Sequence, residues 1–275
     1  MKEYPASHKK NDLATGFMLK PRLKGEKSKT MFTDIGNLSV FTAQSIRSIF
    51  SFPFEGKEFL RQCYVIGNRS FALVAVTGAI MGIVLTIQSR PVLSDFGAES
   101  LLPSMVAISL IREIGPVITA LICAGKIGSG MGAELGSMKV TEQIDAMEVS
   151  ASMPMKYLVA TRVLAATLMV PLLVVFADTL GLLGSWIGVN IKGQVNIALY
   201  FTHAFNSLEF NDLIPALIKS VLFGAIIGIV GCYKGYSAGK GTESVGIAAN
   251  SAVVLSSFLI ILFDLIVVQI TDLVI

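Results

Sequence analysis

Charged side chains are scarce in this chain of 275 residues. Asp, Glu, Lys and Arg together make up 15% of it, whereas a soluble domain carries about a quarter. Hydrophobic residues make up 53% and are gathered in long runs. A soluble all-α core would need a polar face on most of its helices, and these runs have none. The scarcity of charge therefore argues against a soluble helical protein and favours a membrane protein.

Residues that carry catalytic and metal chemistry are also few. The two histidines, His8 and His203, have no paired acidic residues at ligand spacing. The three cysteines lie far apart in or beside apolar runs, which indicates small hydrophobes rather than a disulfide or zinc site. GYSAGKGT at 235–242 has the wrong glycine spacing for a nucleotide-binding loop, and Gly241 stands where that loop needs Ser or Thr. We therefore expect no catalytic residue, metal or cofactor in this chain and no nucleic-acid partner. If ATP is used, a partner binds it.

Five apolar runs are long enough to cross a bilayer, for which a helix needs about 20 residues. The first is short unless it begins near Tyr64, and the third suits a tilted helix that extends beyond the bilayer. The runs span 71–87, 101–124, 157–189, 213–232 and 251–270. The predicted fold class is an all-α polytopic membrane protein with five transmembrane helices.

Basic residues are concentrated on one side of this predicted topology. With a cytoplasmic N-terminus, that side holds 18 of the 22 Lys and Arg residues, counting Arg162 at the start of the third run. The opposite side holds only Arg90 and Lys192. Because cytoplasmic loops are enriched in Lys and Arg, we expect the N-terminus in the cytoplasm and the C-terminus on the outer side.

The first 62 residues precede the five-span domain, 63–275. Residues 1–32 are rich in Lys and lack the apolar core of a signal peptide. We expect a solvated tail attracted to anionic lipid headgroups, with a transit peptide as the alternative. In 33–62, apolar residues recur at helical spacing from Ile35 to Ile49. This predicts an amphipathic helix at the membrane interface, with a soluble helix packed on a partner as the alternative.

Charged residues inside the predicted spans are the stronger functional signal. An ionised group near the bilayer centre costs about 2.5–3.5 kcal/mol, so each one needs a partner or a wet cavity. Asp178 lies in the third span, and the others are Arg112, Glu113, Lys219 and Asp264. The charges of these last four sum to zero, which indicates a network of two pairs. Such a network either holds helices together or acts in transport, and both interpretations stay open.

Small residues recur at four-residue spacing in several spans. This spacing is typical of helices whose backbones approach closely. The glycine series are 78 and 82, 128 to 136, 184 and 188, and 224 and 228. We expect tightly packed helices, and one of these faces could serve a homodimer.

The segment between the second and third spans is more than a polar linker. It is the Gly-rich stretch GKIGSGMGAELGSMKVTEQIDAMEV at 125–149. Over about 133–150, helical periodicity places Val140, Ile144 and Met147 on one face, with Glu142 and Asp145 on the other. This predicts a cytoplasmic coupling helix that docks into a groove of a soluble partner. An amphipathic helix resting on the membrane fits the pattern equally well.

Residues 109–149, SLIREIGPVITALICAGKIGSGMGAELGSMKVTEQIDAMEV, closely resemble the signature region of the MlaE family. These proteins are permease subunits of ABC transporters that work with MCE-domain proteins, and the similarity extends from about residue 52 to the C-terminus. The resemblance implies a homodimer in the bacterial inner membrane and a cytoplasmic ABC ATPase that binds ATP and Mg. It also implies a periplasmic MCE-domain protein and a phospholipid or related lipid as cargo.

The resemblance further implies roles for particular residues. Glu142, Gln143 and Asp145 match the EQxDA motif of the family, and we group Glu134 with them as candidates for coupling to the ATPase. The four intramembrane charges match charged positions that recur in the spans of the family.

A lipid permease needs an apolar cavity that opens to the outer side. Its lining should come from the outer ends of the first two spans, although each residue there, taken singly, could be ordinary packing surface. The candidates are Leu85, Val92, Leu93, Phe96 and Ile114.

Two other functions fit the sequence less well than the permease does. A stand-alone secondary carrier coupled to an ion gradient would use the four intramembrane charges, and it predicts inverted repeats, which five spans do not supply. A lipid-modifying enzyme is third, because no nucleophile–base or metal set is present.

Overall fold

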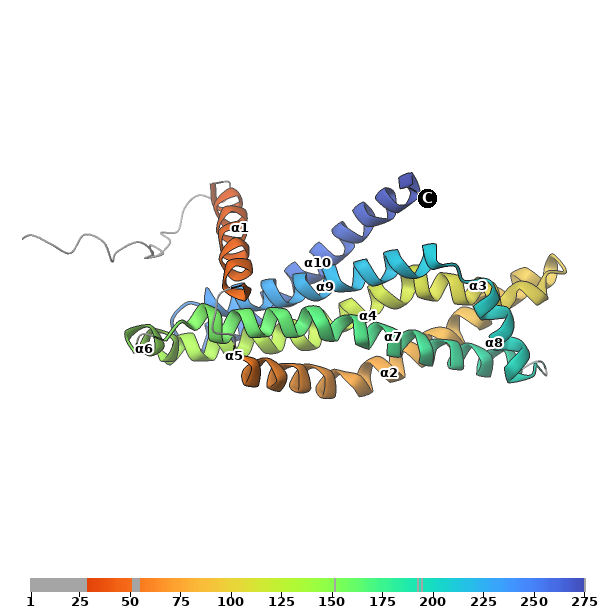
Figure 1. The fold of residues 1–275 in the computed structure, drawn as a ribbon, viewed down its shortest axis with the longest axis horizontal. Coiled ribbons are helices and arrows are strands. Elements are labelled where there is room, and N and C mark those ends of the chain that lie inside the picture. Colours follow the sequence, from red (N-terminus) through yellow and green to blue (C-terminus); the bar gives the residue numbers. More distant parts are fainter. Residues whose placement is uncertain (1–28, 51–54, 151, 192, 194, 275) are drawn as a thin grey trace, which may run out of the picture. The chain divides into compact units, whose positions relative to one another are not determined.

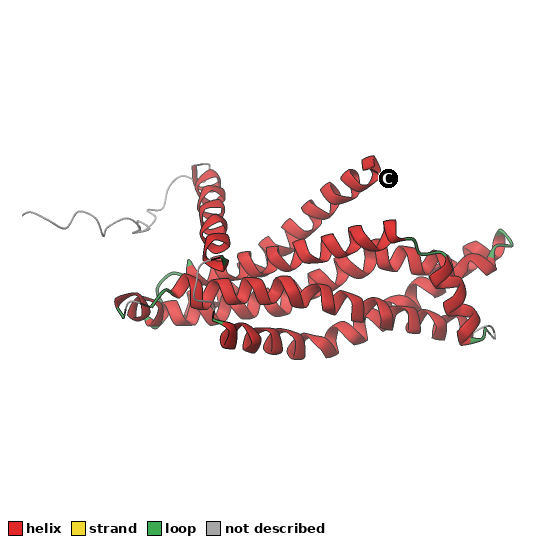
Figure 2. Cartoon of the chain, in the orientation of Figure 1, coloured by secondary structure: helices red, strands yellow, loops and turns green. Residues whose placement is uncertain are grey.

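The structure is a computed structural model that describes residues 29–50, 55–150, 152–191, 193 and 195–274. Within these ranges the regular structure is helical throughout and contains no strand (Figure 2). The chain divides into two units, residues 1–37 and 38–275. The described part of the first unit is the beginning of helix α1 (Lys29–Ile49). The second unit contains the membrane helices.

Five helical stretches are long and apolar enough to cross a membrane. They are α2 (Gly56–Asp95), a run of consecutive helices over Glu99–Val140, η4 with α7 (Met155–Asn190), α9 (Phe210–Tyr236) and α10 (Thr242–Val274). The prediction of an all-α polytopic membrane protein with five spans is therefore confirmed. At 1.5 Å per residue, α2 is about 60 Å long and extends well beyond the hydrocarbon layer.

The N-terminal boundaries differ from those predicted. Residues 56–62, assigned to the interfacial segment, are instead the first two turns of α2. The predicted tail falls mostly on residues 1–28, which lie outside the described part of the chain. On α1, Phe41 is buried and its ring packs on Tyr233 of α9, with ring centroids 5.4 Å apart. Whether α1 also lies at a membrane surface stays a prediction.

The second span is not a regular α-helix. It consists of η1 (Glu99–Leu101), α3 (Leu102–Ser109), η2 (Leu110–Ile114), α4 (Gly115–Cys123), η3 (Ala124–Gly128) and α5 (Ser129–Val140). The segments η2 and η3 are π-helical turns, which occur often at functional sites. The first of them ends just before Pro116, a residue that cannot donate the backbone hydrogen bond of a regular helix. The charged pair Arg112 and Glu113 lies in this wide turn.

The spans α2 and α7 (Thr161–Asn190) run side by side (Figure 1). Their backbones meet at glycines, as the four-residue spacing predicted. A Cβ atom on Gly78 would lie 2.6 Å from the carbonyl oxygen of Ala177, and one on Gly82 or Gly184 would clash more severely. On α9, a Cβ atom on Gly224 would lie 2.6 Å from the carbonyl oxygen of Ala166 on α7. Close helix packing is confirmed at these positions. These glycines contact other helices of the same chain.

The loop between α7 and α9 contains a helix that the sequence did not predict. Helix α8 (Ile197–Asn206) begins at Asn196, whose side chain accepts a hydrogen bond from the backbone N–H of Ala198 at 2.9 Å. Tyr200 is fully buried, and its hydroxyl contacts that of Ser185, which in turn contacts that of Thr86. Burial raises the pKa of the Tyr200 phenol. This hydroxyl chain ties α8 to α7 and α2 at one end of the bundle.

Candidate functional site

The segment between the second and third spans forms two helices rather than one. Helix α5 ends at Val140 and α6 spans Gln143–Val149. Glu142 lies between them in the left-handed region, with φ of 59°. This conformation costs a non-glycine residue about 1–2 kcal/mol and turns the chain sharply. The predicted continuous helix over about 133–150 is therefore wrong at this point, because periodicity alone cannot reveal a single left-handed residue.

Helix α6 is anchored by its apolar side. Ile144 is fully buried in the main core, and Met147 packs against the same core. The side chains of Glu142, Gln143 and Asp145 are exposed. The division into a buried apolar face and an exposed polar face thus agrees with the sequence pattern. It leaves three polar side chains on a helix that is held firmly in place.

Two polar contacts hold α6 to its neighbours. The Lys139 ammonium at the end of α5 donates a hydrogen bond to Oδ1 of Asp145 at 2.5 Å. The Tyr236 hydroxyl at the end of α9 donates to Oε1 of Glu148 at 2.9 Å. The predicted coupling residue Asp145 therefore already has one cationic partner, while its side chain stays 51% exposed.

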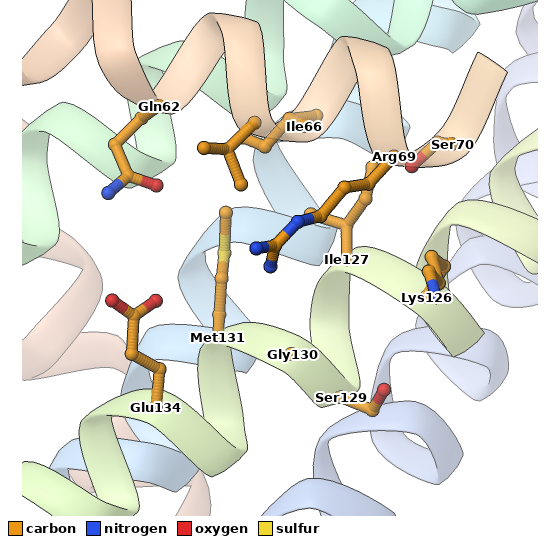
Figure 3. A pocket seen from close by; sticks show the side chains of 11 residues that line it. Gln62, Ile66, Arg69, Ser70, Lys126, Ile127, Ser129, Gly130, Met131 and Glu134 are labelled. Carbon is orange, nitrogen blue, oxygen red and sulfur yellow. The ribbon is translucent and has the colours of Figure 1, made fainter.

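Glu134 has different surroundings from the three residues of the EQxDA motif. Its carboxylate accepts a hydrogen bond from Nη2 of Arg162 at 2.8 Å. The Arg162 side chain is only 3% exposed and also donates to the carbonyl oxygen of Leu158. Glu134 lines a cavity between α5 and α2 (Figure 3). The structure thus places this residue in an ion pair with the third span.

Three of the four predicted intramembrane charges come together. Nζ of Lys219 lies 2.6 Å from Oε1 of Glu113 and 3.1 Å from Oδ1 of Asp264. The Lys219 side chain is 2% exposed. One buried ammonium group thus joins the second, fourth and fifth spans. We refer to Glu113, Lys219 and Asp264 as the lysine cluster.

The fourth charge, Arg112, pairs outside the lysine cluster. Its Nη1 atom lies 3.5 Å from Oδ1 of Asp212 in the first turn of α9. The predicted arrangement of two pairs is therefore corrected to one cluster and one separate pair. Asp212 was not among the predicted intramembrane charges because it lies just before the predicted fourth span. Asp212 also forms a capping box with Glu209. The three-residue spacing of these two acids before an apolar run is a sequence signal for the start of a helix at this point.

Asp178 packs against Gly115, directly after the π-helical turn η2 of the second span. Its Oδ1 atom occupies the place that a Cβ atom on Gly115 would take. Among the described residues this oxygen has no hydrogen-bond partner. A side chain at position 115 would have to displace the carboxyl group of Asp178, and its Cβ atom would lie 2.9 Å from the carbonyl oxygen of Leu110. Across the same part of the chain, no cluster of three or more His, Cys, Asp or Glu side chains could hold a metal ion.

The lipid-cavity candidates separate into two groups. Val92 and Phe96 at the end of α2 have exposed fractions of 57% and 82%. Leu85 and Leu93 pack against the second apolar core, which contains Tyr200, and Ile114 is half-buried. Only the first two thus present a free apolar surface within the single chain.

Comparison with known proteins gives consistent matches over most of the chain. The family described as Permease MlaE matches residues 59–270. A probable ABC transporter permease protein of Rickettsia typhi is 39% identical over 247 residues, which cover 90% of this chain and 95% of that protein.

Two further relatives come from other organisms. The intermembrane phospholipid transport system permease protein MlaE of Haemophilus influenzae is 34% identical over 77% of this chain and 81% of its own length. The chloroplastic protein TRIGALACTOSYLDIACYLGLYCEROL 1 of Arabidopsis thaliana is 31% identical over 80% of this chain and 63% of its own length.

Proposed function

The chain belongs to the MlaE permease family of ABC transporters, and we propose that it is the membrane subunit of an ATP-driven phospholipid transporter in the bacterial inner membrane. The name of the Haemophilus influenzae relative supports phospholipid as the cargo. The observation that carries the proposal is α6, a short helix anchored between two spans that exposes Glu142, Gln143 and Asp145.

A cytoplasmic ATPase subunit binds ATP and Mg in this proposal, and it docks on α6. The exposed polar side chains provide the contact, while buried Ile144 transmits the movement of the helix to the core. A helix fixed by its apolar face moves with the spans to which it is attached. The ion pair between Glu134 and Arg162 joins the neighbouring α5 to the third span. In this proposal it helps to transmit the movement of α6 to that span.

A second copy of the chain and a periplasmic MCE-domain protein complete the proposed transporter. The first and fifth spans are the least buried within the chain: 22% and 17% of their apolar windows are buried, compared with 67% for the third. These two spans therefore have the most apolar surface left for a second copy. The distribution of basic residues supports an N-terminus in the cytoplasm and a C-terminus in the periplasm.

The lipid path in this proposal follows the outer end of α2. Val92 and Phe96 supply exposed apolar surface there, and the second copy would close the cavity around it. We expect Phe96→Asn to reduce lipid transport and lipid co-purification severalfold, since a polar amide disfavours acyl chains. Phe210→Asn is the matched control, because Phe210 is also 81% exposed but lies outside the proposed lining. Equal transport by wild type and Phe96→Asn would remove this residue from the path.

Coupling through α6 is tested by a pull-down of the tagged chain in mild detergent. Wild type is compared with Glu142→Lys/Asp145→Lys, and bound proteins and lipids are identified by mass spectrometry. We expect an ATPase to co-purify with wild type only, because two added cations reverse the charge of the docking surface. Lipid should remain with both forms, and Lys240→Glu in the loop before α10 serves as the charge-reversal control.

The outcome also separates the proposal from the ion-coupled carrier. If neither form captures an ATPase while both keep their fold, the ABC mechanism fails. Uptake driven by an ion gradient in vesicles that contain only this chain would then support the carrier.

A further inference from the structure

A cavity of about 360 Å³ lies between the beginning of α2 and the segment η3–α5 of the second span. Its size is within the range of small-molecule sites. One side is formed by Gln62, Ile66, Arg69 and Ser70, and the other by residues from Lys126 to Glu134 (Figure 3). The cavity lies near the beginning of α2, whereas the proposed lipid path follows the other end of that helix.

Two cationic residues, Arg69 and Lys126, line this cavity. Arg69 extends from α2 into the space between the two walls (Figure 3), and Lys126 comes from η3. Among the residues that the structure describes, neither side chain forms an ion pair. The single carboxylate in the lining, Glu134, is already held by Arg162 at 2.8 Å. The cavity therefore has an excess of positive charge.

The cavity lining also includes the buried side chain of Ser70. Ser70 is fully buried, and within the described part of the chain its Oγ atom has no hydrogen-bond partner. A serine in a helix commonly donates to a carbonyl oxygen one turn earlier. Ser129, on the opposite wall of the cavity, donates to the carbonyl oxygen of Gly125 in this way. A buried polar atom without a partner destabilises the folded protein. The Ser70 hydroxyl is thus available to donate to an oxygen atom of a ligand.

The position of the two cations along the spans corresponds to lipid headgroups. Arg69 precedes the apolar run that begins at Phe71, and Lys126 follows the run that ends at Ala124. Because the first two spans are antiparallel, both residues lie at the same boundary, on the side of α6. The cavity adds apolar surface from Ile66, Ile127 and Met131, which suits the first carbons of an acyl chain.

We propose that this cavity binds the phosphate group of a membrane phospholipid in the leaflet on the α6 side. Arg69 and Lys126 contact the phosphate oxygens, the Ser70 hydroxyl donates a hydrogen bond to one of them, and Ile66 and Met131 contact the adjoining chains. Phosphate is the chemistry that an arginine, a lysine and a free hydroxyl recognise together. The identification of the ligand as a lipid rests on the proposed function.

The test uses the purified full chain and three probes. The first is a phosphatidylglycerol with a photoreactive group on its headgroup, and the second is the matching diacylglycerol without phosphate. The third is inorganic phosphate, added as a competitor. After irradiation, cross-linked peptides are mapped by mass spectrometry. Wild type should react with the first probe within residues 62–70 and 126–134 and should react little with the second.

The variant Arg69→Gln/Lys126→Gln should lower this cross-linking by at least about tenfold, because it removes both positive charges that contact the phosphate. Lys57→Gln on the same helix, outside the cavity, should leave cross-linking unchanged. Arg69→Lys/Lys126→Arg should retain most of it, which keeps the test decisive if the neutral variant folds poorly. Ser70→Ala should cause a smaller loss.

Undiminished cross-linking in the neutral variant, with its fold intact, would overturn the proposal. Competition by inorganic phosphate at the same concentration as the lipid probe would overturn the lipid assignment in favour of free phosphate. The assay needs no ATPase and no transport. Failure of the proposed function therefore shows itself in the pull-down, and failure of this site shows itself here.

Discussion

Lys219 illustrates how much a single residue can depend on its surroundings. Its ammonium group is buried and contacts two carboxylates, from Glu113 and Asp264. The sequence already showed that these charges lie inside spans and need partners. It did not show that one lysine would serve two acids, or that Arg112 would pair with Asp212. Those pairings depend on the rotation of each helix about its axis, which composition does not determine.

Removal of the Lys219 ammonium should strongly destabilise the protein. We expect Lys219→Met to lower the free energy of unfolding by about 3–5 kcal/mol, since it leaves two carboxylates without their cation. Thermal unfolding in detergent measures the effect. Lys139→Met, which removes a more exposed ammonium at the surface, should cost much less.

A triple variant separates the two interpretations of the lysine cluster. Lys219→Met/Glu113→Gln/Asp264→Asn removes all three charges together and should restore most of the stability. If it also restores transport, the cluster only holds helices together. Restored stability without transport would show that the charges act in the cycle. A Lys219→Met variant as stable as wild type would contradict the buried pairing altogether.

At the scale of the helices, the contact between α2 and α7 is predictable and sensitive. The four-residue glycine spacing indicated close packing, and the structure confirms it at Gly78 and Gly82. Gly82→Ala should lower stability by about 1–3 kcal/mol, because the new methyl group would collide with the backbone of α7. Gly246→Ala on α10 meets no atom within 4 Å and should be neutral or slightly stabilising. Equal melting temperatures for the two variants would argue against the helix contact.

The helices that differ from prediction share a physical cause. The α5–α6 segment breaks at Glu142 because one residue adopts positive φ, and a single dihedral leaves hydrophobic periodicity almost unchanged. Helix α8 was missed because its ten residues are too few for a span. It becomes stable through the burial of Tyr200 against neighbouring helices. Short elements of this kind depend on tertiary contacts more than on local propensity.

For the whole molecule, the distribution of basic residues predicts a cytoplasmic N-terminus and a periplasmic C-terminus. Cysteine labelling tests it in a chain with Cys63→Ala, since Cys123 and Cys232 are fully buried. A maleimide that cannot cross the inner membrane should label Asn206→Cys from the periplasm. Ser237→Cys, at the other end of α9, should react only in inverted vesicles. The reverse pattern would contradict the orientation and, with it, the cytoplasmic position of α6.

The sequence by itself determined the five spans, the family and the exposed motif on α6. These properties follow from hydrophobic runs, glycine spacing and a local motif, all of which lie in consecutive residues. The tertiary structure alone decided the charge pairings, the insertion of Asp178 against Gly115 and the cavity with Arg69, Ser70 and Lys126. Each of these joins residues from different spans. Their contacts depend on how helices cross and rotate against one another, and a linear pattern does not carry that information.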